Sequence, residues 1–269
     1  MTMDDLYISR FSTWAPGIES PAEWNEWALG RRNIASCTKG PEISFTDSMF
    51  RRRLSQISKM TIQVIHDLLP LSENTKILFL SLRGELSRQY QINKMLIEEK
   101  ALMPAAFSLS VFNAPVALAS IALGLKGGYT AIYPPENNLF GKTFFPGFDA
   151  GLAAAQAALL ADMASHGQNA EIVLVYADEE IPPEYSCFFR ECPAPLAFAL
   201  LISAGQHTHQ HTHQYTHQDT HQDTHQDTHQ KYAEEGHLSV PLSSLNANFA
   251  SPFDFLKGLL TGGSMHEAS

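Results

Sequence analysis

The chain has 269 residues, of which 44% are hydrophobic, and its formal net charge is −10. This length and composition are typical of one globular domain with a full core, so we expect a single domain over residues 1–269. The negative charge argues against nucleic acid as a partner, because phosphate binding needs a concentrated basic face. The only basic cluster, residues 51–53, falls within a helical pattern and is interpreted as a solvated helix surface.

The cysteines and the N-terminus indicate the cellular compartment. The three cysteines, Cys37, Cys187 and Cys192, lack the even number and the repeated spacing of a disulfide framework or a zinc site. The N-terminus lacks the basic start and apolar stretch of a signal peptide, and no run reaches the roughly 18–20 apolar residues that span a bilayer. We therefore expect a reduced, cytoplasmic protein with no membrane span, no structural metal and no cofactor.

Strand and helix patterns alternate in the first part of the chain. Residues 6–13 alternate as a strand does, and the Ser-Pro pair at 20–21 is typical of a helix start. Apolar residues spaced three and four apart predict one amphipathic helix over 48–69. The apolar run 76–82 predicts a buried strand, and 86–100 predicts another helix.

Two later segments, 113–123 and 150–164, are apolar on nearly every face, and the second is very rich in alanine. Such helices must be covered all round, and a single α/β layer would leave much of them exposed on a monomer, so we expect an interface with another protein. Further strands are predicted at 129–133, 171–176, 196–203 and 237–242. Strands that alternate with helices indicate an α/β fold, with a mostly parallel, mixed sheet flanked by helices.

Residues 206–230 differ in kind from the rest of the chain. They repeat Thr-His-Gln with a four-residue period and hold eight of the twelve histidines. Imidazoles at this density can chelate transition metals loosely, so a metal-binding or scaffolding role is one interpretation. Because nothing in the tract can fill a core, we expect instead a polar, disordered insertion that joins two strands.

Residues 104–139 resemble the core of β-ketoacyl synthases. The resemblance rests on PAAFSLSVFN at 104–113 and GLKGGYTAI at 124–132. In those enzymes an Asn-containing segment leads into a helix, and a Gly-Leu-Arg-Gly-Pro turn then starts the strand that delivers the nucleophilic cysteine. Lys126 stands for that arginine and Gly128 for that proline. The resemblance implies a thiolase-like α/β fold corresponding to the N-terminal half of a ketosynthase.

The position of the family's cysteine falls on Glu136 in a gap-free alignment. Another register would change which residue replaces the cysteine but would not restore one, because no cysteine lies between Cys37 and Cys187. Ketosynthases hold the acyl chain as a thioester on a thiolate. A carboxylate cannot form that thioester, and its charge would repel the malonyl group. The resemblance therefore implies a chain without catalytic residues.

Weaker matches extend the resemblance over nearly the whole chain apart from the histidine tract. Residues 7–17, 80–86 and 251–256 resemble the first strand, the Arg-Gly-Glu-Leu turn and the C-terminal helix of short ketosynthase-like subunits. Such cysteine-less subunits resemble the chain-length factors of bacterial type II systems, especially those that make aryl polyenes. This implies a heterodimer with a full-length β-ketoacyl-ACP synthase, and acyl carrier protein as an indirect partner.

The alignment also implies which residues border the partner's acyl tunnel. Ala105 and Ala106 are small and would leave room for a long chain, whereas Phe107 or Phe112 would close the tunnel. The alternative is that both phenylalanines only pack the core. The remaining residues expected at the tunnel or the interface are Asn113, Tyr129, Ala131, Tyr133, Pro134 and Pro135.

An enzyme in its own right is a second reading of the chain. Glu136 or Asp149 would then act as a general base, for example in the decarboxylation of a carrier-bound malonyl group. A lone carboxylate without an acid–base partner is a poor catalytic constellation, so the non-catalytic reading is favoured.

Overall fold

A computed structural model defines the architecture. It describes residues 6–101, 103–133, 148–166, 171–188, 194–204, 240–241, 249 and 251–261. The predicted insertion at 206–230 and the candidate residues Pro134, Pro135 and Glu136 lie outside them.

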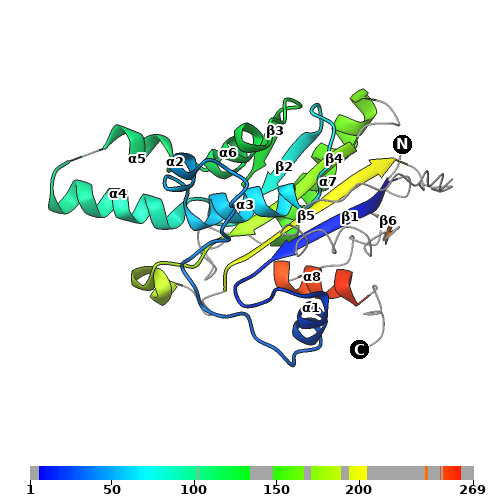
Figure 1. Ribbon diagram of the computed structural model, residues 1–269, viewed down its shortest axis with the longest axis horizontal. Coiled ribbons are helices and arrows are strands. Elements are labelled where there is room, and N and C mark those ends of the chain that lie inside the picture. The colour runs from blue at the N-terminus through cyan, green and yellow to red at the C-terminus, as the bar shows by residue number, and fades with distance from the viewer. Residues whose placement is uncertain are drawn as a thin grey trace, which may run out of the picture.

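A six-stranded mixed sheet forms the centre of the described structure (Figure 1), in the order β3-β2-β4-β5-β1-β6. Its strands are β1 (Leu6–Trp14), β2 (Lys76–Leu80), β3 (Tyr129–Ile132), β4 (Glu171–Asp178), β5 (Leu196–Ala204) and β6 (Val240–Pro241). The predicted α/β class with a mixed sheet is confirmed. The parallel part is smaller than expected, because only β2–β3 and β2–β4 are parallel and the other three pairings are antiparallel.

The return of the chain from β4 to β5 explains this change of direction. A parallel neighbour requires a crossover connection, usually an α-helix. Among its described residues the β4–β5 connection contains only the short 3₁₀ helix η2 (Pro183–Phe188), so that β5 returns antiparallel. The apolar sequence of β5 does not indicate whether this strand runs parallel or antiparallel to its neighbours.

Helices cover both faces of the sheet and explain why β2 and β4 are continuous apolar runs. The helices are α1 (Pro21–Ala28), α2 (Ser48–Arg51), α3 (Gln56–His66), α4 (Leu86–Glu98), α5 (Pro104–Ser108), α6 (Ala114–Leu123), α7 (Phe148–His166) and α8 (Pro252–Leu260). Ile77 and Phe79 pack beneath α3 and α6, whereas Leu78 and Leu80 face the core that α1, α7 and α8 cover. Successive strand residues therefore point into two separate cores.

Local capping decides where the first helices begin. Ser20 and Glu23 form the capping box of α1, as the Ser-Pro pair predicts. The prediction of one helix over 48–69 is wrong, because the segment forms α2 and α3 with a break between them. At the break the Ser55 hydroxyl accepts a hydrogen bond from the Ser58 backbone N–H and starts a new helix. The three-and-four spacing of apolar residues continues across this break, so the sequence pattern does not indicate that the helix is interrupted.

The two apolar helices are covered on one side only. In α6, Val116 and Ala119 are fully buried, whereas Ile121 is 71% exposed. In α7, Leu152 and Leu159 face the core while several alanines face outward. No helix in the described ranges has both the length and the apolar character needed to cross a membrane.

Candidate functional site

The candidate site begins at the open edge of the sheet. β3 is the last strand in the sheet order and, among the described strands, pairs only with β2. Its other edge therefore presents a row of backbone N–H and C=O groups to which another strand can add. Tyr129 and Tyr133, at the two ends of this strand, are exposed.

Exposed apolar side chains concentrate in the part of the chain that ends with this strand. Of the eleven large hydrophobic residues exposed in the described structure, eight lie between positions 96 and 133. We call these eight residues the apolar edge: Leu96, Ile97, Met103, Phe107, Val111, Ile121, Tyr129 and Tyr133. They belong to α4, α5, α6, β3 and the adjoining loops, and Figure 1 shows α4 and α5 projecting from the body of the sheet. Exposed apolar side chains in such number are typical of a surface that contacts another protein.

The predicted tunnel residues Ala105, Ala106 and Phe107 all lie on α5. Phe107 is 55% exposed, so it does not pack the core. Phe112 is half-buried, with ring centroids 6.0 Å from Phe79 and 5.2 Å from Tyr133. The two phenylalanines therefore differ: Phe112 is held in place by other rings, whereas Phe107 is displayed on the surface.

Asn113 and Ala131 connect this region to β3. The Asn113 side-chain amide donates a hydrogen bond of 3.1 Å to the Tyr129 hydroxyl, which ties the start of α6 to β3. Ala131 stands opposite Phe79 of β2 and packs partly against the core beneath α6. The structure thus brings Asn113, Tyr129, Ala131 and Tyr133 together with Phe112.

A buried polar network follows the carboxyl end of β2, in the loop 81–85. Asp178, at the end of β4, accepts hydrogen bonds from the Ser81 hydroxyl at 2.6 Å and from the backbone N–H groups of Leu82 and Arg83 at 3.0 Å each. The Tyr176 hydroxyl also donates to Asp178, and burial, followed by the charge of Asp178, raises the pKa of Tyr176 well above its usual value. Asp178 therefore fixes the first half of the loop.

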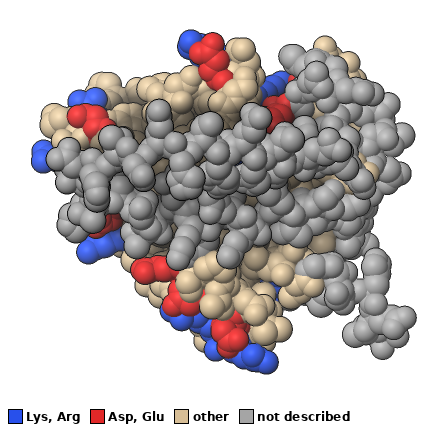
Figure 2. All heavy atoms as spheres, turned by 45° about the vertical axis from the view of Figure 1, so that its right-hand side comes forward, with Lys and Arg blue, Asp and Glu red and all other residues tan. Residues whose placement is uncertain are grey.

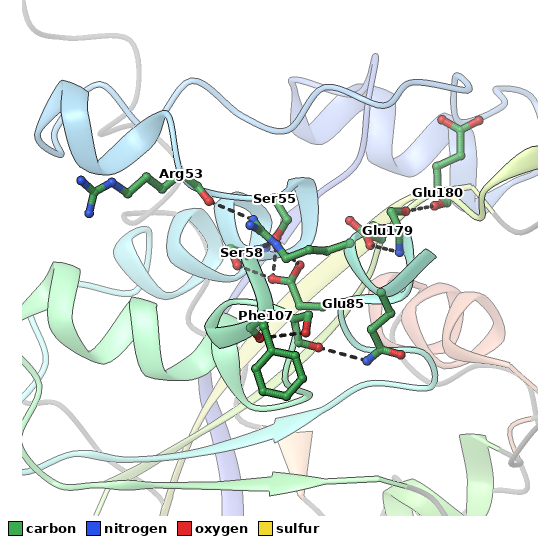
Figure 3. A network of polar contacts seen from close by, with 11 residues as sticks. Arg53, Ser55, Ser58, Glu85, Phe107, Glu179 and Glu180 are labelled. Atoms are coloured by element: carbon green, nitrogen blue, oxygen red, sulfur yellow. Dashed lines mark hydrogen bonds and ion pairs between the residues drawn. The ribbon is translucent and has the colours of Figure 1, made fainter. Parts of the chain in front are cut away.

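Two glutamates hold the second half of the loop (Figure 3). The Glu85 carboxylate is fully buried and accepts hydrogen bonds from the Ser55 and Ser58 hydroxyls at 2.6 and 2.8 Å and from Arg88 Nε at 3.2 Å. Glu179 accepts a 2.9 Å bond from the Ser87 backbone N–H at the start of α4. Burial, and then the like charge of Glu85, raise the pKa of Glu179 to about 7.

This network was not predicted from the sequence. Asp178 and Glu179 directly follow a buried strand, and that signal could have marked a polar cluster at the carboxyl edge of the sheet. The network's acceptors are occupied by neighbouring donors from α3, α4 and the loop itself, so it serves as an internal anchor. It holds no described group of three side chains suited to a metal ion, and none occurs elsewhere in the described ranges.

Three further groups that can take part in acid–base or nucleophilic chemistry lie outside this network. His66 is the one histidine whose side chain is described, and its ring stacks on Phe45 with the centroids 3.6 Å apart. Asp149, the second candidate base, is exposed in the first turn of α7. Cys37 is the one described thiol and lies in the loop before α2.

Several charged side chains on the surface form ion pairs. On the face drawn in Figure 2, the described acidic and basic residues are interspersed rather than gathered by sign. Lys126 Nζ lies 2.7 Å from the Glu73 carboxylate, and Arg32 lies 2.8 Å from Glu23. Within the predicted basic cluster, Arg51 donates to the Ser44 carbonyl and so holds the loop before α2.

Comparison with known proteins identifies the family. Residues 24–250 match the sequence model of the β-ketoacyl synthase N-terminal domain. The chain belongs to the β-ketoacyl synthase family. The predicted resemblance and the thiolase-like fold class are thereby confirmed for this ketosynthase-like chain. No curated protein sequence matches it.

Two solved structures place the ketosynthase-like chain more closely. It is similar to the ketosynthase ApeO in complex with its chain length factor ApeC from Xenorhabdus doucetiae, with 26% identity, a TM-score of 0.56, and coverage of 75% of this chain and 79% of that chain. It is also similar to a ketosynthase of the bacillaene synthase from Bacillus subtilis, with 14% identity, a TM-score of 0.50, and coverage of 74% and 36% respectively. The second similarity shows the fold alone.

Proposed function

We propose that this ketosynthase-like chain is a chain-length factor, a subunit without catalytic activity of its own that pairs with a full-length β-ketoacyl-ACP synthase. In the pair it stabilises the synthase and shapes its acyl tunnel. The observation that carries the proposal is the open edge of β3, together with the exposed side chains of the apolar edge, in a family member that has no cysteine between Cys37 and Cys187.

The missing cysteine supports the non-catalytic part of the proposal. Condensation requires an acyl group held on a thiolate, and the resemblance assigns that position to Glu136. This residue lies outside the described structure. A carboxylate at this position would leave acyl transfer to the partner's cysteine.

The open edge supports the pairing part of the proposal. Pairing of β3 with the corresponding strand of the synthase, in antiparallel orientation, would satisfy its free backbone groups and cover the apolar edge. Obligate interfaces of this kind bury roughly 2,000 Å² or more. The similarity to a ketosynthase–chain length factor complex supports a synthase as the partner.

Phe112 is the residue that we propose as the end of the partner's tunnel. An end that sets a length must stay in one place, and Phe112 is held by Phe79 and Tyr133. Ala105 and Ala106, on α5, are the small residues that we propose to leave room for a long acyl chain. We propose a linear acyl chain of the polyene or polyketide type as the tunnel's content, delivered by an acyl carrier protein that docks on the synthase.

Co-expression with candidate ketosynthases, followed by sizing of the complex, tests the proposed pairing. Ile121→Asp should abolish the complex, because Ile121 is the most exposed member of the apolar edge outside the α4–α5 projection. It is a better probe than Ala131→Asp, since Ala131 packs partly against the core and its replacement would also disturb folding.

Leu29→Asp provides the matched control for this experiment. Leu29 is also an exposed apolar residue, but it lies at the end of α1, on the other side of the sheet from α6. The control should assemble as the wild type does. A well-behaved monomer that binds no ketosynthase, or an acyl adduct found on this chain by intact-mass measurement, would contradict the proposed function.

A further inference from the structure

Gly84 lies directly against the ring of Phe112. A Cβ added to Gly84 would stand 2.6 Å from Phe112 Cδ2 and 3.2 Å from Phe112 Cε2, well inside van der Waals contact. The backbone of Gly84 also has a left-handed φ of +59°. Only a residue without a Cβ therefore permits both this backbone and this ring position.

The backbone at Gly84 cannot retreat from the ring, because the buried polar network holds it on both sides. The Gly84 N–H donates a 2.7 Å hydrogen bond to the Ser81 hydroxyl, which itself donates to Asp178. On the other side, the Glu85 carboxylate is held by Ser55 and Ser58 of α3 (Figure 3). A side chain at Gly84 would therefore be accommodated by movement of Phe112.

The direction of that movement follows from burial. Gly84 is buried and Phe112 is half-exposed, so a ring displaced from Gly84 moves outward, toward the surface that carries the apolar edge. Restoring ordinary carbon–carbon contact from 2.6 Å requires a shift of about 1 Å. On the proposed function, this is a shift toward the partner's acyl chain.

We infer that Gly84 is a specificity-determining position: by leaving room for the ring of Phe112, it sets the depth of the tunnel available to a linear acyl thioester. This inference rests on the proposed function. Gly84 acts through Phe112 and is therefore a positioning residue rather than one that touches the acyl chain.

A double-mutant comparison in the assembled complex tests the inference. The complex is supplied with malonyl-loaded acyl carrier protein, and the products are identified by mass spectrometry. Gly84→Ala should shift the ratio of long to short products toward shorter chains by roughly fourfold, the factor that one buried methylene contributes. In the Phe112→Ala background, Gly84→Ala should have no further effect on this ratio, because the residue through which it acts is absent.

Gly124→Ala is the matched control. Gly124 also has a left-handed φ, of +67°, but a Cβ there would meet no atom within 4 Å. Gly124→Ala should therefore introduce a backbone strain similar to that of Gly84→Ala and leave the product ratio unchanged. If Gly84→Ala folds poorly, Gly84→Asn keeps a side chain at the position with a residue that tolerates the left-handed region better.

The possible outcomes separate the inference from the proposed function. A changed ratio in Phe112→Ala with an unchanged ratio in both Gly84 variants would overturn the inference and leave the proposed function standing. The same shift in Gly124→Ala as in Gly84→Ala would overturn it too. A partner-independent readout is the ¹⁹F resonance of 4-fluorophenylalanine at position 112, which should move in Gly84→Ala and not in Gly124→Ala. An unmoved resonance would contradict the displacement itself.

Discussion

At the scale of single residues, the buried carboxyl group of Glu179 couples the fold to pH. Its pKa is raised from 4.5 to about 7, first by burial and then by Glu85. The folded state therefore binds a proton that the unfolded chain releases between these two values. This stabilisation is fully present below pH 4.5, falls as the pH rises, and is lost above about 7. Its full size is about 3 kcal/mol.

Glu179→Gln should therefore raise the free energy of unfolding at pH 8 by about 1–3 kcal/mol and leave it nearly unchanged at pH 4.5. The amide oxygen of glutamine can still accept the hydrogen bond from Ser87 and carries no charge beside Glu85. Urea unfolding at the two pH values measures the difference. Glu98→Gln, at the exposed end of α4, is the control and should leave the pH dependence in place.

Two further substitutions address the tunnel at residue scale. Ala106→Phe should fill space on α5 and shorten the products of the complex, whereas Phe112→Ala should remove the proposed end of the tunnel and lengthen them. Each buried methylene changes the binding of an acyl chain by roughly 0.8 kcal/mol, enough to alter a product distribution visibly. Product profiles that match the wild type in both variants, with the complex intact, would place the end of the tunnel elsewhere.

At the scale of elements, the Ser55 hydroxyl at the break between α2 and α3 stabilises two parts of the fold. Ser55 caps α3 through the Ser58 N–H and also donates to the buried Glu85 carboxylate. α4 depends on the same junction, because Ile92 is its one buried residue and its base is fixed by Ser87 and Arg88. The projection formed by α4 and α5 is thus anchored by polar contacts at one end and by the edge-to-face contact of Tyr90 with Tyr185.

Ser55→Ala should consequently lower the free energy of unfolding by about 1–3 kcal/mol, because a helix cap is lost and a buried carboxylate loses one donor. The exposed Ser108→Ala, which removes a hydroxyl bonded only within α5, should change it by less than about 0.5 kcal/mol. Thermal or urea unfolding of the two variants measures both. Equal effects would show that the junction at Ser55 contributes nothing to stability beyond a surface serine.

The elements themselves could largely be predicted from the sequence. Apolar runs marked β2, β4 and β5, and capping residues marked the start of α1, because burial and local hydrogen bonding act within a few residues. The break at Ser55 could not be predicted, since Glu85 lies thirty positions away and the apolar spacing is uninterrupted. The antiparallel direction of β5 depends on the connection between β4 and β5, and hydrophobic periodicity carries no information about strand direction.

At the scale of the whole molecule, the exposed apolar surface could be predicted in outline, and its detail could not. An all-apolar α6 indicated an exposed patch, and the resemblance pointed to the segment from Ala105 to Tyr133. The environments of Phe107 and Phe112 differ because of contacts with distant residues, among them Gly84 and Phe79. Contacts between residues this far apart in the sequence cannot be recognised from a local pattern of apolar and polar residues.

Deletion of residues 206–230 tests the proposal that the chain is one domain interrupted by a polar insertion. Loop closure depends only weakly on length, so the shortened chain should fold with nearly the same thermal midpoint and should bind the same partner. Both can be read from one preparation by a melting curve and by sizing of the complex. A drop of many degrees on deletion would show that the tract is part of the core after all.

The open edge of β3 has a consequence for how this protein must be produced. A chain that leaves the ribosome unpaired would present the edge of this strand together with the exposed apolar side chains of the described residues, and like edges can add to one another in open-ended stacks. The unpaired subunit is thus an aggregation hazard whose severity rises with its concentration. If the two proteins pair as proposed, a cell has to make them in similar amounts. The synthase would then protect this chain from aggregation, because binding covers the exposed strand edge and apolar side chains.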